Sequence, residues 1–476
     1  AMLTTVLFFA AASLAQAAYY DLMPPGPALE ITPLGTYKTN TFDESATEIL
    51  AYDPNTMQLI HTNANDGTLD VLDFSDPSAP TLITQLELPG GPNSCDIFDS
   101  LAAVAVENDD GTQNGYVVFF DMYSLEMIGK VMVGNLPDML TFTPDGKYVV
   151  VANEGEPSDD YTFDPEGSVS IVDVKSMTAK MLDFKKFNGK KEYLMKMGVR
   201  IFGPGATVAQ DLEPEYIAIS PDGKTAVVVC QENNAFVVVD LKKMEIDGIV
   251  PIGFKDHSKA GNEFDASNED DMINIQSWPT LGMYMPDGIA SFEAKGKTYY
   301  ISANEGDSRD YDGYSEEIRF ADICPPDFED GMVNVDKFDD IDSLCMDENL
   351  GRLKLTIANG LNEDTGMYDT LYSYGARSFS IFNEKLEMIY DSGSWLELIT
   401  ADAIPDDFNA NNDENDSFDS RSDDKGPEPE AVTIAYLGDS IYAFVLLERV
   451  SGIAVFDVSD PYEPVFDQFF HNRDFS

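Results

Sequence analysis

Acidic residues recur at one position of a repeated sequence pattern, at the start of a short apolar segment. In four of the repeats the acid directly follows a proline, as in Pro137-Asp138 and Pro214-Glu215. The acids at this first position are Glu48, Asp138, Glu215, Asp287 and Glu430, with Asp96 at a related place. Carboxylate oxygens are ligands that hard cations such as Ca²⁺ prefer, so we expect this set to bind metal.

A second set of polar residues ends the next apolar segment of each repeat. Its members are Asn65, Glu107, Glu154, Glu232, Glu305 and Glu448. One strand of an antiparallel pair begins at the edge where its neighbour ends, so both sets are expected around one face. Like charges at such short range repel unless a counter-charge is present. We expect Ca²⁺ to supply it, with a second divalent or trivalent metal as an open question. A solvated acidic surface is the simpler alternative.

Arginines are scarce, and two of them follow the acids of the second set. Arg309 comes shortly after Glu305, and Arg449 directly follows Glu448. A guanidinium group among metal-bound carboxylates can bind a phosphate in a forked geometry. We therefore expect Arg309, Arg449 and Glu305 to be the catalytic residues of a phosphate-processing site, with Arg377 nearby. The alternative is an ordinary ion pair between arginine and carboxylate.

One loop carries oxygen-bearing side chains at alternate positions. These are Asp407, Asn409, Asn411, Asp413 and Asn415. The pattern resembles a calcium loop, but Asn412 stands where an EF-hand needs glycine and Phe418 where it needs glutamate. We expect a separate Ca²⁺ site on Asp407, Asn409, Asn411 and Asp413. Asn415-Asp416-Ser417 is also a glycosylation sequon, which is typical of an exported glycoprotein.

The elements that must position these residues form an internal repeat. Short alternating apolar segments rich in Val, Ile, Tyr and Phe occur in sets, separated by turns such as Pro-Asp-Gly. The sets cover residues 47–88, 95–133, 138–174, 215–253, 287–306 with 376–393, and 430–470. Four strands in a unit of ~40–50 residues predict an all-β protein, a β-propeller with six four-stranded blades. A β-sandwich does not explain the repetition.

We expect residues 19–476 to form one propeller domain, with insertions at about 183–210, 255–284, 307–373 and 399–427. Residues 31–39 precede the first unit and are expected to form an N-terminal closing strand. The sequence stops soon after the sixth unit, so the ring has either six blades or an incomplete seventh.

Charge and the N-terminal residues restrict the class of protein. The 476 residues include 86 Asp and Glu against 29 Lys and Arg, which gives a formal net charge of −57. This excludes a nucleic-acid partner, because phosphate binding needs a basic surface. The apolar segment Leu3 to Ala12 and the following Ala15-Gln16-Ala17 predict a signal peptide over residues 1–18 and a secreted protein. No apolar segment is long enough to cross a membrane.

Cysteines and histidines add two expectations. Cys324 and Cys345 are the best candidates for a disulfide, whereas Cys95 and Cys230 adjoin or lie in predicted strands and can be free and buried. The chain has only 3 histidines and no C-x-x-C spacing, so neither a His/Cys zinc site nor a histidine-dependent hydrolase is expected.

Long blocks of the sequence resemble one known family. They include LPDMLTFTPDGKYVVVANEG at 136–155, EPEYIAISPDGKTAVVVCQEN at 213–233 and ANEGDSRDYDGYSEE at 303–317. They resemble the choice-of-anchor I family, which includes mesenchyme-specific cell-surface glycoproteins, and atypical calcium-dependent alkaline phosphatases are similar to it. The resemblance covers roughly residues 30–476. It implies a secreted or surface-attached β-propeller, and metal-dependent phosphomonoester hydrolysis as the activity.

Two functions are therefore carried forward. The first is a secreted, alkaline phosphatase-like phosphomonoesterase, in which Ca²⁺ activates a water molecule to attack a small phosphorylated substrate. The second is a non-catalytic Ca²⁺-binding protein of the extracellular matrix or of biomineralisation, whose acidic surface binds mineral or a cationic matrix. A lactonase-like propeller hydrolase with one channel calcium is a third alternative.

Overall fold

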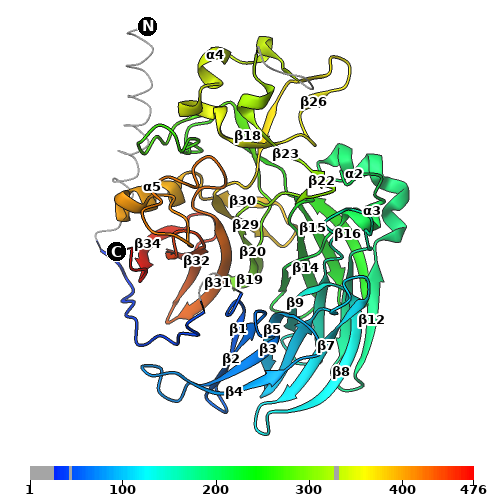
Figure 1. The fold of residues 1–476 in the computed structure, drawn as a ribbon. Helices are drawn as coiled ribbons and strands as arrows, with labels where there is room; N and C mark the ends of the chain where they lie inside the picture. The colour runs from blue at the N-terminus through cyan, green and yellow to red at the C-terminus, as the bar shows by residue number, and fades with distance from the viewer. Residues whose placement is uncertain (1–25, 42–44, 326–331, 476) are drawn as a thin grey trace. The chain divides into compact units, whose positions relative to one another are not determined.

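The computed structural model describes residues 26–41, 45–325 and 332–475 (Figure 1). The expected signal peptide lies outside these ranges. The described residues fall into two compact units. We call residues 32–251 with 311–313 the N-terminal unit, and residues 252–310 and 314–475 with 26–31 the C-terminal unit. Each unit is described by itself.

The N-terminal unit contains four sheets, each of four antiparallel strands in chain order. The sheets comprise β1 (Leu50–Asp53), β2 (Gln58–Asn63), β3 (Thr68–Asp73) and β4 (Thr81–Glu87); β5 (Pro92–Phe98), β6 (Leu101–Val106), β7 (Asn114–Asp121) and β8 (Glu126–Asn135); β9 (Pro137–Phe142), β10 (Tyr148–Asn153), β11 (Ser168–Asp173) and β12 (Thr178–Asp183); and β13 (Ile217–Ile219), β14 (Thr225–Cys230), β15 (Ala235–Asp240) and β16 (Glu245–Pro251).

The C-terminal unit contains two further sheets of the same kind. They comprise β19 (Ile289–Ala294), β20 (Lys297–Asn304), β29 (Ser378–Asn383) and β30 (Met388–Asp391); and β31 (Pro429–Leu437), β32 (Ser440–Leu447), β33 (Gly452–Asp457) and β34 (Val465–His471). Six such sheets are propeller blades, which confirms the predicted all-β propeller class.

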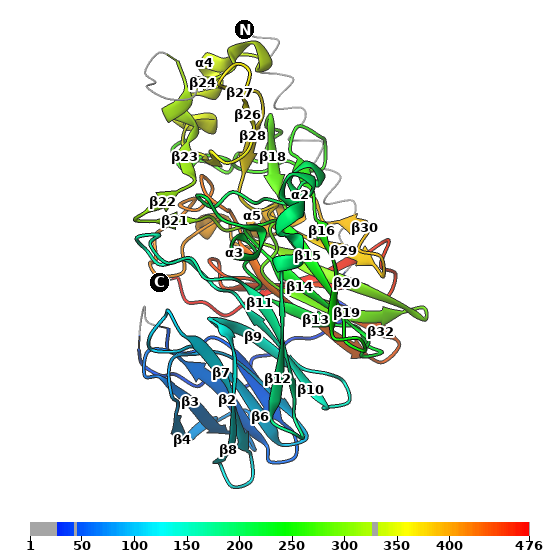
Figure 2. The same cartoon turned by 90° about the vertical axis from the view of Figure 1, so that its right-hand side faces the viewer.

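The insertions carry short strands and the helices. The strands are β17 (Phe254–Asp256), β18 (Thr280–Met283), β21 (Asp310–Tyr311), β22 (Tyr314–Ser315), β23 (Glu317–Arg319), β24 (Met332–Val333), β25 (Lys354–Thr356), β26 (Leu361–Asn362), β27 (Met367–Tyr368) and β28 (Leu371–Ser373). The helices are η1 (Lys185–Lys190), α2 (Lys191–Met197), α3 (Val208–Asp211), η2 (Phe320–Ile323), η3 (Val335–Lys337), α4 (Ile341–Leu344), η4 (Asp347–Gly351), α5 (Trp395–Ala403) and η5 (Pro405–Asp407). Strands β18 and β28 pair in parallel, unlike the blade strands (Figure 2).

The strands within a blade differ in burial, and the sequence explains the difference. The second strands are nearly continuous apolar runs, such as the valines of β10 and β14, and both their faces are buried. The fourth strands are less buried, and β4 and β12 carry mostly exposed side chains. The Pro-Asp-Gly turns that join β9 to β10 and β13 to β14 place Gly146 at φ +66° and Gly223 at φ +69°, a region that favours glycine.

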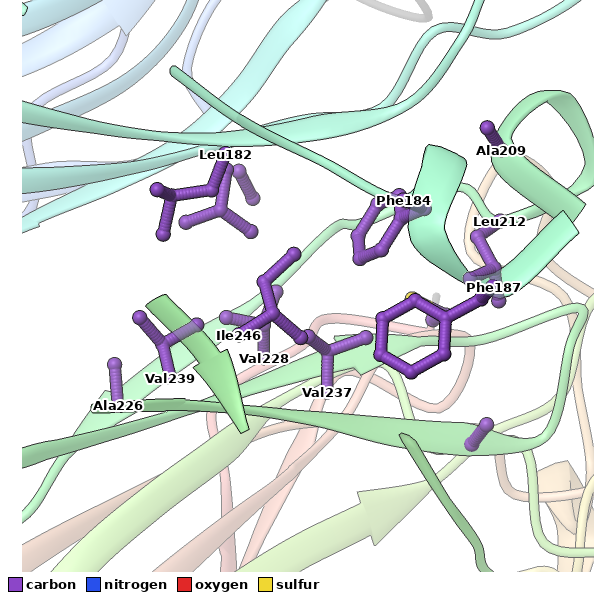
Figure 3. Close-up of a cluster of buried hydrophobic side chains, with 14 of the residues drawn as sticks. Leu182, Phe184, Phe187, Ala209, Leu212, Ala226, Val228, Val237, Val239 and Ile246 are labelled. Carbon is purple, nitrogen blue, oxygen red and sulfur yellow. The ribbon is translucent and has the colours of Figure 1, made fainter. Parts of the chain in front are cut away.

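The helical insertion at 185–211 packs onto the third and fourth blades. Phe184 and Phe187 are buried in one cluster with Val228 and Val237 of the fourth blade (Figure 3). Burial of a phenylalanine side chain stabilises a fold by roughly 1.5–3 kcal/mol. The insertion therefore extends the hydrophobic core of the N-terminal unit.

The predicted closing strand at 31–39 does not form, since these residues have no strand conformation. Pro33 has no N–H to donate to a ladder. Instead, the preceding residues bind side chains of β34. The N–H groups of Ala28 and Leu29 donate to the carboxylate of Asp467 at 2.6 and 3.3 Å, and Gln468 Nε2 donates to the Leu29 carbonyl at 2.7 Å.

The predicted disulfide between Cys324 and Cys345 is present, and Cys95 and Cys230 are free and buried, as expected. Within the described ranges, no helix is both long and apolar enough to cross a membrane.

Replacing both Cys324 and Cys345 with alanine is expected to lower the free energy of unfolding by about 2 kcal/mol, because the unfolded chain loses a cross-link. Urea unfolding of oxidised protein measures the change. Reductant should bring the wild type to the value of the variant and leave the variant unchanged. Equal stability of the oxidised wild type and the variant would contradict the prediction.

Candidate functional site

A buried asparagine fixes the strand end that precedes the acid at Glu154. Asn153 is the last residue of β10 and is fully buried. Its Nδ2 donates to the hydroxyls of Ser168 and Ser170 at 3.2 and 3.0 Å, and its Oδ1 accepts from the Gly134 N–H at 2.9 Å. These three hydrogen bonds fix the side chain of Asn153 and so determine where Glu154, the next residue, follows the end of the strand.

The same arrangement recurs in the C-terminal unit before Glu305. Asn304 ends β20, is fully buried, and donates to the hydroxyls of Ser378 and Ser380 at 3.2 and 2.8 Å. The hydroxyl of Ser302 donates to Asn304 Oδ1 at 2.7 Å. In both units, an Asn-Glu-Gly sequence is thus paired with Ser-x-Ser on the next strand of the blade.

Four predicted ligands act on one another in the N-terminal unit. Burial, together with the charges of Glu156, Glu48 and Glu232, raises the pKa of Asp138 to about 7. Burial also raises the pKa of Glu154 well above its ordinary value, and the charges of Asp138, Glu156 and Glu232 contribute. We call these five residues the N-terminal acidic cluster. Glu48 and Glu156 are exposed, and Asp138 and Glu154 are partly buried.

Sequence reasoning missed Glu156 within this cluster and two groups beside it, Tyr311 and Glu213. Glu156 accepts a 2.6 Å hydrogen bond from the hydroxyl of Tyr311, and Glu213 adds to the rise in the pKa of Glu154. Their signal was present in the sequence. Glu156 belongs to an E-G-E motif and Glu213 to an E-P-E motif, and both patterns recur in the C-terminal unit, as E-G-D at 305–307 and E-P-E at 428–430.

Of three further predicted positions of the N-terminal unit, Glu215 and Glu107 lie at the expected strand ends and Asp96 lies inside a strand. Glu215 is buried just before β13, where its N–H donates to the Val229 carbonyl at 2.9 Å. Glu107 directly follows β6, and burial raises its pKa, with contributions from Asp109 and Glu156. Asp96 lies within β5, and its carboxylate accepts hydrogen bonds from both the N–H of Phe142 and the hydroxyl of Thr141.

In the C-terminal unit, Glu305 and Glu448 meet Glu428, which sequence reasoning also missed. One carboxylate oxygen from each lies within 4.8 Å of the others. We call these three residues the C-terminal acidic cluster. Burial raises the pKa of Glu305 to about 7. Burial and the charge of Glu448 raise the pKa of Glu430 to about 7 as well. Asp287 lies partly buried just before β19.

Three cations of the protein itself neutralise the C-terminal acidic cluster. Lys425 Nζ lies 2.8 Å from Glu305 Oε1. Arg449 Nε lies 3.2 Å from Glu428 Oε2 and 3.0 Å from Glu448 Oε2. Arg421 Nε donates to Glu428 Oε1 at 2.6 Å. Three carboxylates thus face three cationic side chains, so the cluster has its counter-charge without a metal ion.

The arginines expected to bind phosphate are engaged inside the protein. Arg309 is 1% exposed, and its N–H donates to Glu316 at 3.2 Å. Arg449 holds Glu428 and Glu448 as described, and Arg377 forms a buried ion pair of 2.8 Å with Glu397. The ion-pair alternative therefore describes Arg377 and Arg449, and a phosphate-binding role for Arg309 and Arg449 stays a prediction.

The loop at 407–415 does not present its oxygens on a common surface. Asn409 is fully buried and donates to the Ser422 hydroxyl at 2.8 Å, whereas Asp413 is exposed. Asn411 Oδ1 accepts from the N–H of Asn412 at 2.9 Å. Burial raises the pKa of Asp407, against the charge of Arg473. Phe408 is also buried, so the chain turns inward here, and a Ca²⁺ site on Asp407, Asn409, Asn411 and Asp413 stays a prediction.

The predicted metal ligands therefore fall in both units. Glu48, Asp138, Glu154, Glu215 and Glu232 belong to the N-terminal unit, and Asp287, Glu305, Glu430 and Glu448 belong to the C-terminal unit. Joint binding of one set of ions by all of them stays a prediction. Carboxylates are the charges that most raise the pKa of Asp138 and Glu154, whereas lysine and arginine side chains pair with the C-terminal acidic cluster.

Comparison with known proteins adds the family. A family model of the choice-of-anchor I domain matches residues 48–461. The chain belongs to the choice-of-anchor I family. It is 42% identical over 121 residues to Gigasin-3a of Magallana gigas, a match that covers 24% of the chain and 42% of that protein. It is 27% identical over 341 residues to the mesenchyme-specific cell surface glycoprotein of Strongylocentrotus purpuratus, covering 62% of the chain and 42% of that protein.

The choice-of-anchor I chain thus spans less than half the length of each of these curated relatives. Among solved structures, it is similar to hydrazine synthase of Kuenenia stuttgartiensis, with 12% identity, a TM-score of 0.45, and coverage of 89% of this chain and 80% of that one.

Proposed function

We propose that the chain is a non-catalytic Ca²⁺-binding protein of the cell surface or extracellular matrix. The observation that supports this best is the contrast between the two acidic clusters. Lys425, Arg421 and Arg449 compensate the C-terminal acidic cluster. Among the described residues, the charges that most raise the pKa of Asp138 and Glu154 come from other carboxylates. A hard cation with oxygen ligands is the natural counter-ion for such a group.

The relatives are consistent with a location at the cell surface and with a non-catalytic role. The sea-urchin relative is, by name, a cell surface glycoprotein, and neither curated relative's name describes an enzyme. The burial of Arg309 and the ion pairs of Arg449 leave the phosphomonoesterase hypothesis without an evident phosphate clamp. Ca²⁺, held between carboxylates on blades, would then serve to stabilise the protein and to link it to other acidic or mineral surfaces.

The experiment counts bound Ca²⁺ and measures affinity by calorimetry on the whole chain, after removal of metal with a chelator. Asp138→Asn and Glu154→Gln are each expected to remove one bound ion or to weaken its binding at least tenfold. Glu448→Gln, in the compensated cluster, is the matched control and should leave binding unchanged. Unaltered binding in Asp138→Asn and Glu154→Gln would contradict the assignment of the ion to this cluster.

The second part of the test concerns catalysis. With p-nitrophenyl phosphate as substrate, the protein should release no p-nitrophenol above background, with or without added Ca²⁺. Turnover that chelation abolishes and that Arg449→Met reduces would overturn the non-catalytic proposal in favour of the phosphomonoesterase.

A further inference from the structure

A second group of buried acidic and amide side chains lies in the C-terminal unit, and neither cluster above includes it. Asp265 comes from the insertion before β18, Glu397 from α5, and Asn409, Asp419 and Ser422 from the loop that precedes β31. All five side chains are at most 2% exposed. Segments that are far apart in sequence thus bring polar groups to one interior place.

Shared hydrogen-bond partners connect four of these side chains with one another and with the backbone of Asp265. The carboxylate of Asp265 itself accepts from the N–H groups of Ser267 and Asn274. Glu397 Oε2 accepts from the Asp265 N–H at 3.4 Å and from Asn409 Nδ2 at 3.5 Å. Asn409 Nδ2 also donates to the Ser422 hydroxyl, which itself donates to Asp419 Oδ1. Asn409 therefore lies between Glu397 on one side and the Ser422–Asp419 pair on the other.

Two oxygens of this group have no hydrogen-bond donor. They are Asn409 Oδ1 and Asp419 Oδ2, both buried and without a partner among the described residues. An unpaired buried polar atom destabilises a fold by about 1–3 kcal/mol, and more when it is charged. Both atoms are pure acceptors, so a donor or a cation is required to satisfy them.

The charge of the group is also unbalanced. Arg377 neutralises Glu397 through their 2.8 Å ion pair, but no ion pair joins Asp265 or Asp419 to a lysine or arginine of the described chain. Burial raises the pKa of Asp265 well above its ordinary value, and the charge of Asp419 is the next largest cause. Asp270, partly buried nearby, adds to the rise in the pKa of Asp419.

We propose that Asp265, Asp419 and the side-chain oxygen of Asn409 bind one Ca²⁺ ion in the interior of the C-terminal unit. The donors are all oxygens, two from carboxylates and one from an amide, and such a mixed set with an irregular arrangement suits Ca²⁺. Mg²⁺ prefers octahedral geometry and retains several waters, which a buried site disfavours. The ion would join the insertion before β18 to the loop before β31.

This site is independent of the one proposed for Asp138 and Glu154, so the two can fail separately. The test uses the whole chain freed of metal by a chelator and dialysed, with Ca²⁺ as the probe. Bound Ca²⁺ per chain is counted by equilibrium dialysis. Asp419→Asn and Asp265→Asn are each expected to lose one ion, or to bind it at least 100-fold more weakly. Asp138→Asn should retain this ion and lose the other.

Thermal unfolding, measured with and without Ca²⁺, distinguishes a variant that has lost the binding site from one that has misfolded. Without metal, Asp419→Asn should unfold at the same or a higher temperature than the wild type, because a buried negative charge is removed. With saturating Ca²⁺, the wild type should rise by several degrees and the variant by less. Asn409→Asp should show the opposite pattern, with lower stability without metal and a larger rise with Ca²⁺.

Two results would overturn the proposal. In the first, Asp419→Asn and Asp265→Asn bind as many Ca²⁺ ions as the wild type with equal affinity. In the second, the wild type binds Ca²⁺ but Asp419→Asn and Asn409→Asp show the same Ca²⁺-dependent rise in unfolding temperature as the wild type. A water molecule or a shared proton would then satisfy the two oxygens.

Discussion

Replacing Arg377 with methionine is expected to lower the free energy of unfolding by about 4 kcal/mol, because a buried charge pair loses one partner. Arg377 is 3% exposed and donates to Glu397 Oε1 and to the carbonyls of Asp265, Ser422 and Asp424. Methionine fills a similar volume but leaves one carboxylate and three carbonyl oxygens without this donor. Urea unfolding followed by circular dichroism measures the loss.

Arg352→Met is the matched control for this experiment. Arg352 is a partly exposed arginine whose guanidinium lies 3.5 Å from Asp423 Oδ2, so its loss is expected to reduce stability by less than about 1 kcal/mol. Adding Glu397→Leu to Arg377→Met should recover part of the loss, since the orphaned carboxylate is then removed. If Arg377→Met and Arg352→Met lowered the free energy of unfolding equally, the buried ion pair would contribute no more to stability than the partly exposed one.

Substitution of Glu428 by glutamine is expected to reduce stability by about 3 kcal/mol, because it removes the buried charge shared by several cations. Glu428 is completely buried, and its carboxylate contacts Arg421 at 2.6 Å, Arg449 at 3.2 Å and Lys425 at 3.6 Å. Glutamine keeps the shape but turns an NH₂ group toward a cation.

The comparison that isolates this effect is Glu448→Gln. Glu448 belongs to the same cluster and pairs with Arg449, but its side chain is 28% exposed, so a loss below about 1 kcal/mol is expected. Chemical denaturation of both variants in parallel gives the two values. If Glu428→Gln were as stable as Glu448→Gln, the ion pairs around Glu428 would have to be treated as energetically neutral.

The fold was predictable because its signals are local. Each blade strand is a short run of alternating or continuous apolar residues, and Pro-Asp-Gly turns such as those at Gly146 and Gly223 mark where one strand ends and the next begins. The prediction of a closing strand at residues 31–39 was wrong because the apolar pattern of a strand is present there but no strand that the structure describes pairs with it. The segment reads as a strand, but Pro33 has no N–H for a ladder, and the residues just before the segment bind the side chains of Asp467 and Gln468.

The positions of the acids were predictable, whereas their counter-charges were not. Aligning the repeats placed Glu305 and Glu448 at equivalent strand ends, and the structure brings them together. The cation beside Glu305 is Lys425, which is 120 residues away in sequence and belongs to no repeated pattern. Pairings of that kind depend on how loops fold over the blades, so an alignment of strands within one sequence cannot reveal them.

The asparagine contacts at the ends of β10 and β20 also bear on how the family can vary. Asn153 and Ser168 are 15 residues apart, whereas Asn304 and Ser378 are 74 apart, yet the same amide-to-hydroxyl contact closes both strand pairs. Lengthening a loop adds little closure entropy once its ends are fastened together. The loop between these two strands can therefore differ greatly in length from one blade to another. The pairing of the strands and the position of the acid after the asparagine stay the same.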